Sequence, residues 1–237
     1  MSATIVAPAS TPQVKLARMG GQGVEVVRAD GGYDNAERLA RELAVRTGWP
    51  FVSPYDDDHV LTGNGVSLAW ELVEALGRVP AQVIAPIGGG GLAAGLALGL
   101  EACAAGEPSK RVWAVQSEAS PAFALSVVGG QVMERLEPRV PTLAEGLEGG
   151  ISGRAAARVA ARLAGVSVVS EASISRAMAR LRRDFGLTVE GSGAAAAVLA
   201  LEGLPPGRTG GDVVVLLTGG NVDEEVMAAV VRSSAGC

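Results

Sequence analysis

The chain has 237 residues, of which 48% are hydrophobic and 19% charged, and this composition excludes a disordered segment. The 20 basic and 25 acidic residues give a formal net charge of −5, so nucleic acid and anionic membrane surfaces are not expected partners. Two cysteines form neither a disulfide framework nor a metal cluster, and the N-terminus lacks the charged-then-apolar order of a secretory signal. We therefore expect a globular, cytoplasmic protein.

The first part of the chain alternates short β-branched runs with helical patterns, which is typical of parallel strands joined by crossover helices. The patterns predict strands over 4–7, 24–27 and 50–53, and helices over 11–20 and 34–47. The polar run at 55–59 then breaks the alternation, so we place a domain boundary between residues 54 and 55. Because 54 residues are too few for a complete α/β domain, residues 1–54 are interpreted as the remnant of a small domain and 55–237 as the large one.

The second part continues the same alternation. The patterns predict strands over 83–86, 112–115, 166–169 and 213–217, and helices over 64–77, 91–104, 153–164, 171–185 and 192–203, with Ser170 as an N-cap. The uncharged stretch between Arg78 and Glu101 is not interpreted as a membrane span, because two prolines and four glycines interrupt it. The fold class predicted is α/β, with open parallel sheets and crossover helices.

A strand that runs into Gly88, Gly89, Gly90 and Gly91 and then into a helix is the strongest local feature. Glycine backbone approaches a ligand closely, and amides at a helix N-terminus favour an anion, so this loop predicts a phosphate site without a basic side chain. The alternatives are a structural role, as a plain turn or in tight helix–sheet packing, and a dinucleotide loop. The dinucleotide match is weak, because Gln116 stands where the ribose-binding acid is expected.

A second feature is Thr218-Gly219-Gly220-Asn221, which follows a buried strand. Ligands of open α/β sheets gather at the carboxyl ends of the strands, so the Thr218 hydroxyl is placed to bond a ring heteroatom or a substrate. The alternative is that Thr218 caps the following helix.

Together these runs resemble the fold-type II pyridoxal-phosphate enzymes with tryptophan synthase β-like architecture. Within that class, the chain resembles the serine/threonine dehydratases (threonine ammonia-lyases) and serine racemase. The resemblance rests on runs that fall in the family's order: PYDD at 54–57, GNG at 63–65, GGGGL at 88–92, AVQSEAS at 114–120, TLAEGL at 142–147, VEGSGA at 189–194 and TGGN at 218–221.

The resemblance implies pyridoxal 5′-phosphate as cofactor, with its phosphate on the four glycines 88–91 and its pyridine nitrogen at Thr218. By the same likeness, Gly146 and Glu190 line the cofactor pocket. The implied reaction is dehydration and deamination of L-threonine or L-serine, both small hydroxy amino acids, to a 2-oxo acid and ammonia. The implied assembly is a homodimer.

The chain departs from the family at the Schiff-base lysine and at the substrate-carboxylate loop, which lie in the family's opening part. The sequence has two lysines, Lys15 and Lys110, and neither falls in the corresponding motif, so no catalytic lysine is assigned and both are expected to be solvated. This chain is therefore expected not to catalyse efficient dehydration as it stands. The alternatives are a nicotinamide-dependent oxidoreductase and a non-catalytic subunit that binds the cofactor or an amino acid.

The remaining candidates receive plainer interpretations. Asp56, Asp57 and Asp58 lack the ligand spacing of a calcium loop and are interpreted as a helix-start cluster. His59, the single histidine, is interpreted as a solvated loop residue. No metal is expected at Glu118, because the acids that metal-assisted relatives carry nearby are replaced here.

Overall fold

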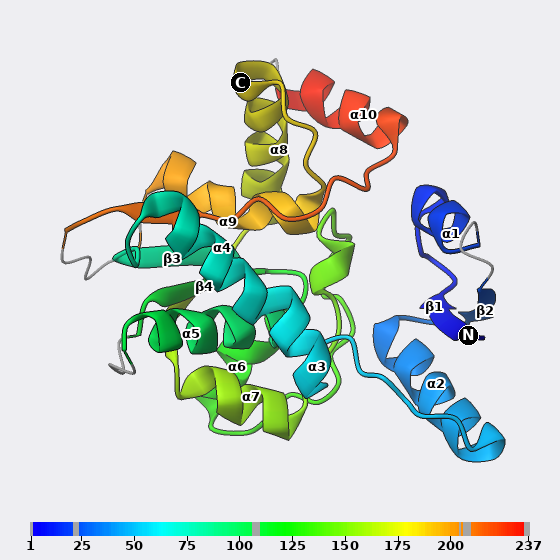
Figure 1. Cartoon of the computed structure of the whole chain (residues 1–237). Coiled ribbons are helices and arrows are strands. Elements are labelled where there is room, and N and C mark those ends of the chain that lie inside the picture. The colour runs from blue at the N-terminus through cyan, green and yellow to red at the C-terminus, as the bar shows by residue number, and fades with distance from the viewer. Residues whose placement is uncertain (1, 21–23, 106–109, 204, 206–209, 235–237) are drawn as a thin grey trace.

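A parallel pair of strands opens the chain in the computed structural model, which describes residues 2–20, 24–105, 110–203, 205 and 210–234. The pair consists of β1 (Thr4–Pro8) and β2 (Glu25–Ala29), in which Thr4 lies opposite Glu25. Helix α1 (Gln13–Gly20) lies between these strands in the chain, and α2 (Tyr33–Thr47) follows and packs on both. Figure 1 shows these elements beside the larger sheet.

The strand predicted over residues 50–53 is wrong, because this segment is irregular. Pro50 has no amide to donate to a sheet, and the Val52 side chain is exposed. The segment instead leads away from α2 as the connection to the next helix (Figure 1).

That helix is continuous from residue 58 to residue 76 and contains one wide turn. It consists of α3 (Asp58–Leu61), the π-helical turn η1 (Thr62–Val66) and α4 (Ser67–Leu76). A Cβ added at Gly95 would lie 2.5 Å from the Leu61 carbonyl oxygen and 2.7 Å from the Gly65 Cα. Glycine is therefore what lets the wide turn and α5 (Gly91–Cys103) touch through their backbones.

The larger sheet has four parallel strands in the order β5-β4-β3-β6. The strands are β3 (Gln82–Pro86), β4 (Val112–Ser117), β5 (Leu163–Val169) and β6 (Val213–Val215). In β3, Val83, Ile84 and Ala85 are fully buried, as expected for a central strand covered on both faces. The sheet has the parallel arrangement that the alternating pattern predicts.

Helices cover both faces of this sheet (Figure 1). On one face, α5 packs on the sheet and is itself covered by α4 and α7 (Gly153–Ala160). On the other face, α9 (Gly191–Glu202) packs on β3 and β4, and α8 (Glu171–Phe185) covers α9 and carries α10 (Glu224–Ser234). Two short helices, α6 (Ala122–Gly129) and η2 (Glu145–Leu147), lie in the connections.

Several helices and strands end at other residues than the sequence predicts. The helix predicted over 153–164 ends at Ala160, because the chain enters β5 at Leu163. The last strand is shorter than predicted and ends at Val215. Ser170 caps α8 as predicted, since its side chain accepts a hydrogen bond from the Ser173 amide. Over the part of the chain that the structure describes, none of the helices combines the length and the apolar character needed to cross a membrane.

Gly95→Ala is predicted to lower the free energy of unfolding by about 2 kcal/mol, because the new methyl group meets backbone atoms that have no room to move. Gly63→Ala in the wide turn is the matched control, since a Cβ there has no neighbour within 4 Å. Urea denaturation of both variants measures the difference. Equal stabilities would contradict the backbone contact between the wide turn and α5.

Candidate functional site

The candidate site lies at the carboxyl edge of the four-stranded sheet, where two neighbouring strands end. Ile84 of β3 pairs with Val215 of β6, and the Leu216 amide donates to the Ile84 carbonyl. Because the pairing is parallel, the glycine loop after β3 and the Thr218 loop after β6 leave the sheet side by side. The sheet register therefore brings together the two features that the sequence singles out.

The glycine loop has the donor set of an anion site. The amides of Gly88, Gly89 and Gly90 bond no carbonyl within the described chain, and they precede α5, whose first helical bond runs from the Ala94 amide to the Gly90 carbonyl. Gly90 has φ of 93°, in the left-handed region that favours glycine. Free amides beside such a residue at a helix N-terminus form a concave site for an anion such as a phosphate.

The glycines are also required by packing, but their neighbours are the Tyr55 linker and helix α7 and not a strand of the sheet. A Cβ at Gly89 would lie 2.2 Å from the Tyr55 ring, and one at Gly91 would lie 2.8 Å from the Tyr55 Cα. A Cβ at Gly90 would lie 2.8 Å from the Val159 side chain. The loop thus lies between the linker that precedes α3 and helix α7.

Thr218 is half-buried, and its hydroxyl has no hydrogen-bond partner among the described residues. It does not cap α10, because the carbonyl that accepts the first bond of that helix belongs to Asp223. The backbone at Thr218 lies directly against α9: a Cβ at Gly193 would lie 1.4 Å from the Thr218 carbonyl oxygen. A close backbone contact therefore holds Thr218 near the strand end, and its hydroxyl is free to bond a ligand.

Gly146 and Glu190 lie in two further loops that contact each other. The Gly146 amide donates to the Ser192 hydroxyl at 2.8 Å, and a Cβ at Gly88 would lie 3.2 Å from the Gly146 carbonyl oxygen. The Glu190 amide donates to the Gly219 carbonyl at 3.2 Å. The TLAEGL, VEGSGA, glycine and TGGN loops therefore form one continuous contact network.

Lys15 is not the solvated lysine that the sequence analysis expects. Its side chain is 19% exposed, and its Nζ lies 3.4 Å from Glu190 Oε2 and 3.7 Å from Glu145 Oε2. The expectation is wrong because α1 lies against the loops of the larger sheet, a contact between distant parts of the chain that no local pattern indicates. Lys110 is exposed, as expected.

Glu171 is a residue that sequence reasoning misses. It begins α8, and its carboxylate accepts hydrogen bonds from the Thr142 hydroxyl at 2.7 Å and the Leu143 amide at 2.8 Å, and from the Ser117 hydroxyl. It therefore fastens the start of the TLAEGL run to the end of β4. An acidic residue in the first turn of a helix was the available signal, but it indicates only helix-dipole stabilisation.

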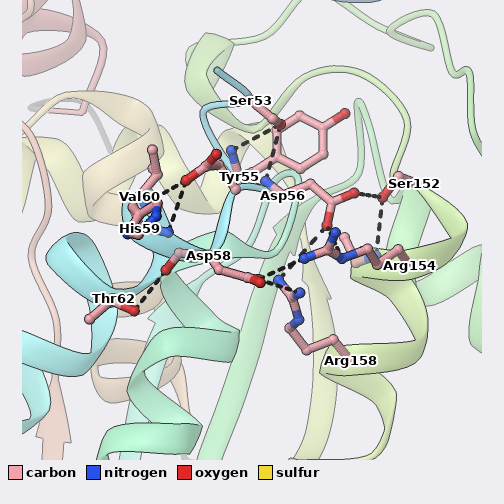
Figure 2. Close-up of polar contacts among 12 residues, drawn as sticks. Ser53, Tyr55, Asp56, Asp58, His59, Val60, Thr62, Ser152, Arg154 and Arg158 are labelled. Carbon is pink, nitrogen blue, oxygen red and sulfur yellow. Dashed lines mark hydrogen bonds and ion pairs between the residues drawn. The ribbon is translucent and has the colours of Figure 1, made fainter. Parts of the chain in front are cut away.

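The acidic cluster has two roles (Figure 2). Asp57 caps α3 by accepting hydrogen bonds from two amides, as its interpretation as a helix-start residue requires. Asp58 instead accepts hydrogen bonds from Arg154 and Arg158 of α7 at 2.7 Å each. His59 lies within α3 and not in a loop, although it is exposed.

Asp56 joins the same cluster from the linker side. Its Oδ2 accepts a hydrogen bond from the Ser152 hydroxyl at 2.7 Å, and its Oδ1 lies 3.5 Å from the Arg154 Nε (Figure 2). The linker that carries Tyr55 is therefore fixed to α7, and this contact holds the Tyr55 ring against the glycine loop.

The end of β4 does not provide the acid of a dinucleotide site. Gln116 is fully buried, and its side-chain oxygen accepts a hydrogen bond from the Ala124 amide. The Glu118 carboxylate accepts a hydrogen bond from the Glu171 amide. Within the ranges that the structure describes, no group of three or more histidine, cysteine, aspartate and glutamate side chains is arranged to hold a metal ion.

Two of the cavities in the described part of the chain differ in whether the site loops line them. One, of about 600 Å³, lies between α2 and Tyr55 and contains none of the predicted site residues. The other, of about 40 Å³, is lined by residues that include Lys15, Glu145, Glu190 and Asp223. We assign the site from the strand-end geometry and the free donors, because the size of a cavity does not show that it holds the groups a ligand needs.

Comparison with known proteins defines the class. The model of the family described as pyridoxal-phosphate dependent enzyme matches residues 1–219, so the chain belongs to this family. The chain is similar to a fungal L-serine ammonia-lyase structure from Rhizomucor miehei, with a TM-score of 0.83 and 28% identity over 99% of this chain and 75% of that one. It is also similar to the threonine deaminase structure from T.th., with a TM-score of 0.78 and 31% identity over 94% and 71% of the two chains.

Among curated proteins, the chain is 30% identical to L-threonine ammonia-lyase of Thermotoga maritima over 231 residues. That match covers 97% of this chain and 55% of the relative, so the chain spans about half of the relative's length. The expected fold-type II architecture, the resemblance to serine/threonine dehydratases and the pyridoxal-phosphate cofactor of the family are confirmed. These matches do not favour the nicotinamide alternative.

Glu148→Gln is predicted to raise the melting temperature by about 2 °C at pH 7. Burial raises the pKa of Glu148, and the carboxylates of Glu145 and Glu137 raise it further, so the ionised side chain destabilises the folded state. The loss of folding free energy caused by the ionised Glu148 side chain is at its full value above the raised folded-state pKa. It disappears as the pH falls below the ordinary glutamate pKa of about 4.3.

Thermal unfolding at pH 7 and at about pH 4 measures this effect, and the gain of the variant is expected to vanish at the lower pH. Glu71→Gln, on the exposed side of α4, is the matched control. A gain that stays the same at both pH values would contradict the electrostatic explanation.

Proposed function

We propose that this chain forms the cofactor-binding part of a pyridoxal-phosphate-dependent ammonia-lyase that acts on L-threonine or L-serine. The observation that carries the proposal is the pair of unpartnered donor groups at neighbouring strand ends, namely the glycine-loop amides and the Thr218 hydroxyl. The names of the relatives, which include threonine and serine ammonia-lyases, support the substrate class.

The residues fit the cofactor on the chemistry of their donors. The amides of Gly88, Gly89 and Gly90, with the N-terminus of α5, would hold the phosphate, together with Gly91 at the first turn of the helix. Thr218 would meet the pyridine nitrogen from the next strand, and Gly146 and Glu190 would line the pocket through the loops that contact both. These site assignments and the domain boundary between residues 54 and 55 remain predictions.

When bound, pyridoxal phosphate supplies an electron sink for bond breaking at the α-carbon of an amino acid. The chain itself contributes orientation at both ends of the cofactor. A neutral hydroxyl at the ring nitrogen restrains the electron sink more than a carboxylate does, which suits elimination of a β-hydroxyl. We also propose a homodimer, in line with the family likeness.

Neither lysine of this chain is proposed to hold the cofactor covalently. The Lys15 ammonium lies between two glutamates. Lys110 is exposed and lies just before β4 begins, at the opposite end of that strand from the candidate site. The lysine chemistry of the family therefore has no assigned residue in this sequence. Binding of the cofactor and turnover are separate properties, and each has its own test.

The binding test uses pyridoxine 5′-phosphate, which has the ring and phosphate of the cofactor but no aldehyde to react with lysine. The wild-type chain is expected to bind it, and Thr218→Val is expected to bind it about tenfold more weakly, the size of one lost hydrogen bond. Thr47→Val, which removes an exposed hydroxyl on α2, is the matched control. Titration calorimetry measures both, and equal affinities of wild type and Thr218→Val would contradict the assignment of Thr218.

The turnover test supplies the chain with pyridoxal phosphate and L-threonine or L-serine and measures formation of the 2-oxo acid. No product above the rate of free pyridoxal phosphate is expected, because the chain has no assigned lysine to take and return the proton. Turnover that Lys15→Met or Lys110→Met abolishes would overturn this expectation and assign the role to that lysine.

A further inference from the structure

Helix α1 contacts three of the loops that form the candidate site. Lys15 lies 3.7 Å from Glu145 in the TLAEGL run and 3.4 Å from Glu190 in the VEGSGA run. One turn further along the helix, the Arg18 guanidinium donates a hydrogen bond to the Asn221 side chain in the TGGN loop. Helix α1, which connects β1 and β2 in the chain, therefore lies against three loops at the edge of the four-stranded sheet.

The Lys15 ammonium is the cation within a group of carboxylates. Glu145, Glu190 and Asp223 line the same small cavity as Lys15. Burial raises the pKa of Glu145, the Lys15 ammonium opposes this shift, and Glu190 and Asp223 add to it. Removal of the ammonium would leave these carboxylates facing one another in a partly buried space, so they would repel each other.

Glu190 connects this charge to the ring end of the site. Its side chain is 17% exposed, and Oε2 is buried without a hydrogen-bond partner in the described part of the chain, with the Lys15 Nζ facing it. A Cβ at Gly219 would lie 2.4 Å from Glu190 Oε1, and the Glu190 amide donates to the Gly219 carbonyl. The Glu190 carboxylate thus packs against the Gly219 backbone next to Thr218, and the Glu190 amide bonds to the same residue.

From these contacts we propose that Lys15 is a positioning residue of the site: it holds the Glu190 carboxylate against Gly219 and thereby sets the Thr218 hydroxyl for the cofactor ring. This inference rests on the proposed function. Lys15 acts at the ring end, whereas the phosphate end depends on the glycine-loop amides, which Lys15 does not contact. Loss of Lys15 therefore weakens ring recognition and leaves phosphate recognition intact.

The experiment compares binding of pyridoxine 5′-phosphate and inorganic phosphate by titration calorimetry. Lys15→Met keeps a long apolar side chain and removes the charge, Lys15→Arg restores the charge, and Lys110→Met is the matched control at the exposed second lysine. Lys15→Met is expected to bind pyridoxine 5′-phosphate about tenfold more weakly and inorganic phosphate as the wild type does. Lys15→Arg is expected to recover most of the lost affinity, and Lys110→Met to match the wild type for both ligands.

Two outcomes overturn the proposal. One is wild-type affinity of Lys15→Met for pyridoxine 5′-phosphate. The other is an equal loss of affinity for both ligands, which a general loss of structure produces. A purely structural lysine would lower stability without separating the two ligands.

A double-mutant cycle, measured by thermal unfolding, tests the Lys15–Glu190 contact in the absence of ligand. Lys15→Met is expected to lower the melting temperature of the wild type by more than it lowers that of Glu190→Gln, because its effect acts through Glu190. Equal shifts in both backgrounds would overturn the Lys15–Glu190 contact. If the wild type binds neither ligand, the proposed function fails, and the cycle still decides whether Lys15 holds Glu190.

Discussion

At the carboxyl edge of the four-stranded sheet, loops from distant parts of the chain pack backbone against backbone. A Cβ at Gly193 would lie 1.4 Å from the Thr218 carbonyl oxygen, and one at Gly191 would lie 2.1 Å from the Leu143 carbonyl oxygen. Any other residue at these positions would push the loops apart. Glycine therefore does more here than turn the chain, because it lets four loops meet and leaves amides and a hydroxyl free for a ligand.

Hydrogen bonds and ion pairs made by charged side chains then fix the surrounding elements on this edge. Asp56 and Asp58 bind the arginines of α7 and hold the linker that places Tyr55 on the glycine loop (Figure 2). Glu171 fastens the TLAEGL run to the end of β4, and Lys15 brings α1 to the VEGSGA run. Each contact joins segments that are distant in sequence, so the geometry of the edge depends on the packing of the whole chain.

The difference between local loops and contacts across the chain explains which features of the site can be predicted from the sequence. The glycine loop and the TGGN loop can be read locally, because backbone freedom and a position after a buried strand are properties of short segments. The roles of Lys15 and Glu171 cannot, since an ion pair or a hydrogen bond between distant segments has no local pattern. The false strand over 50–53 has the same origin: β-branched and aromatic residues favour a strand, but the segment has no neighbouring strand among the described residues.

Amide mapping by NMR decides whether a pyridoxal phosphate lies between the glycine loop and Thr218. A titration of the ¹⁵N-labelled chain with pyridoxine 5′-phosphate is predicted to shift the amide resonances of Gly88, Gly89, Gly90 and Thr218, while those of α2 beside the larger cavity stay in place. Shifts confined to α2, or none at the strand ends, would show that the cofactor does not bind between these two loops.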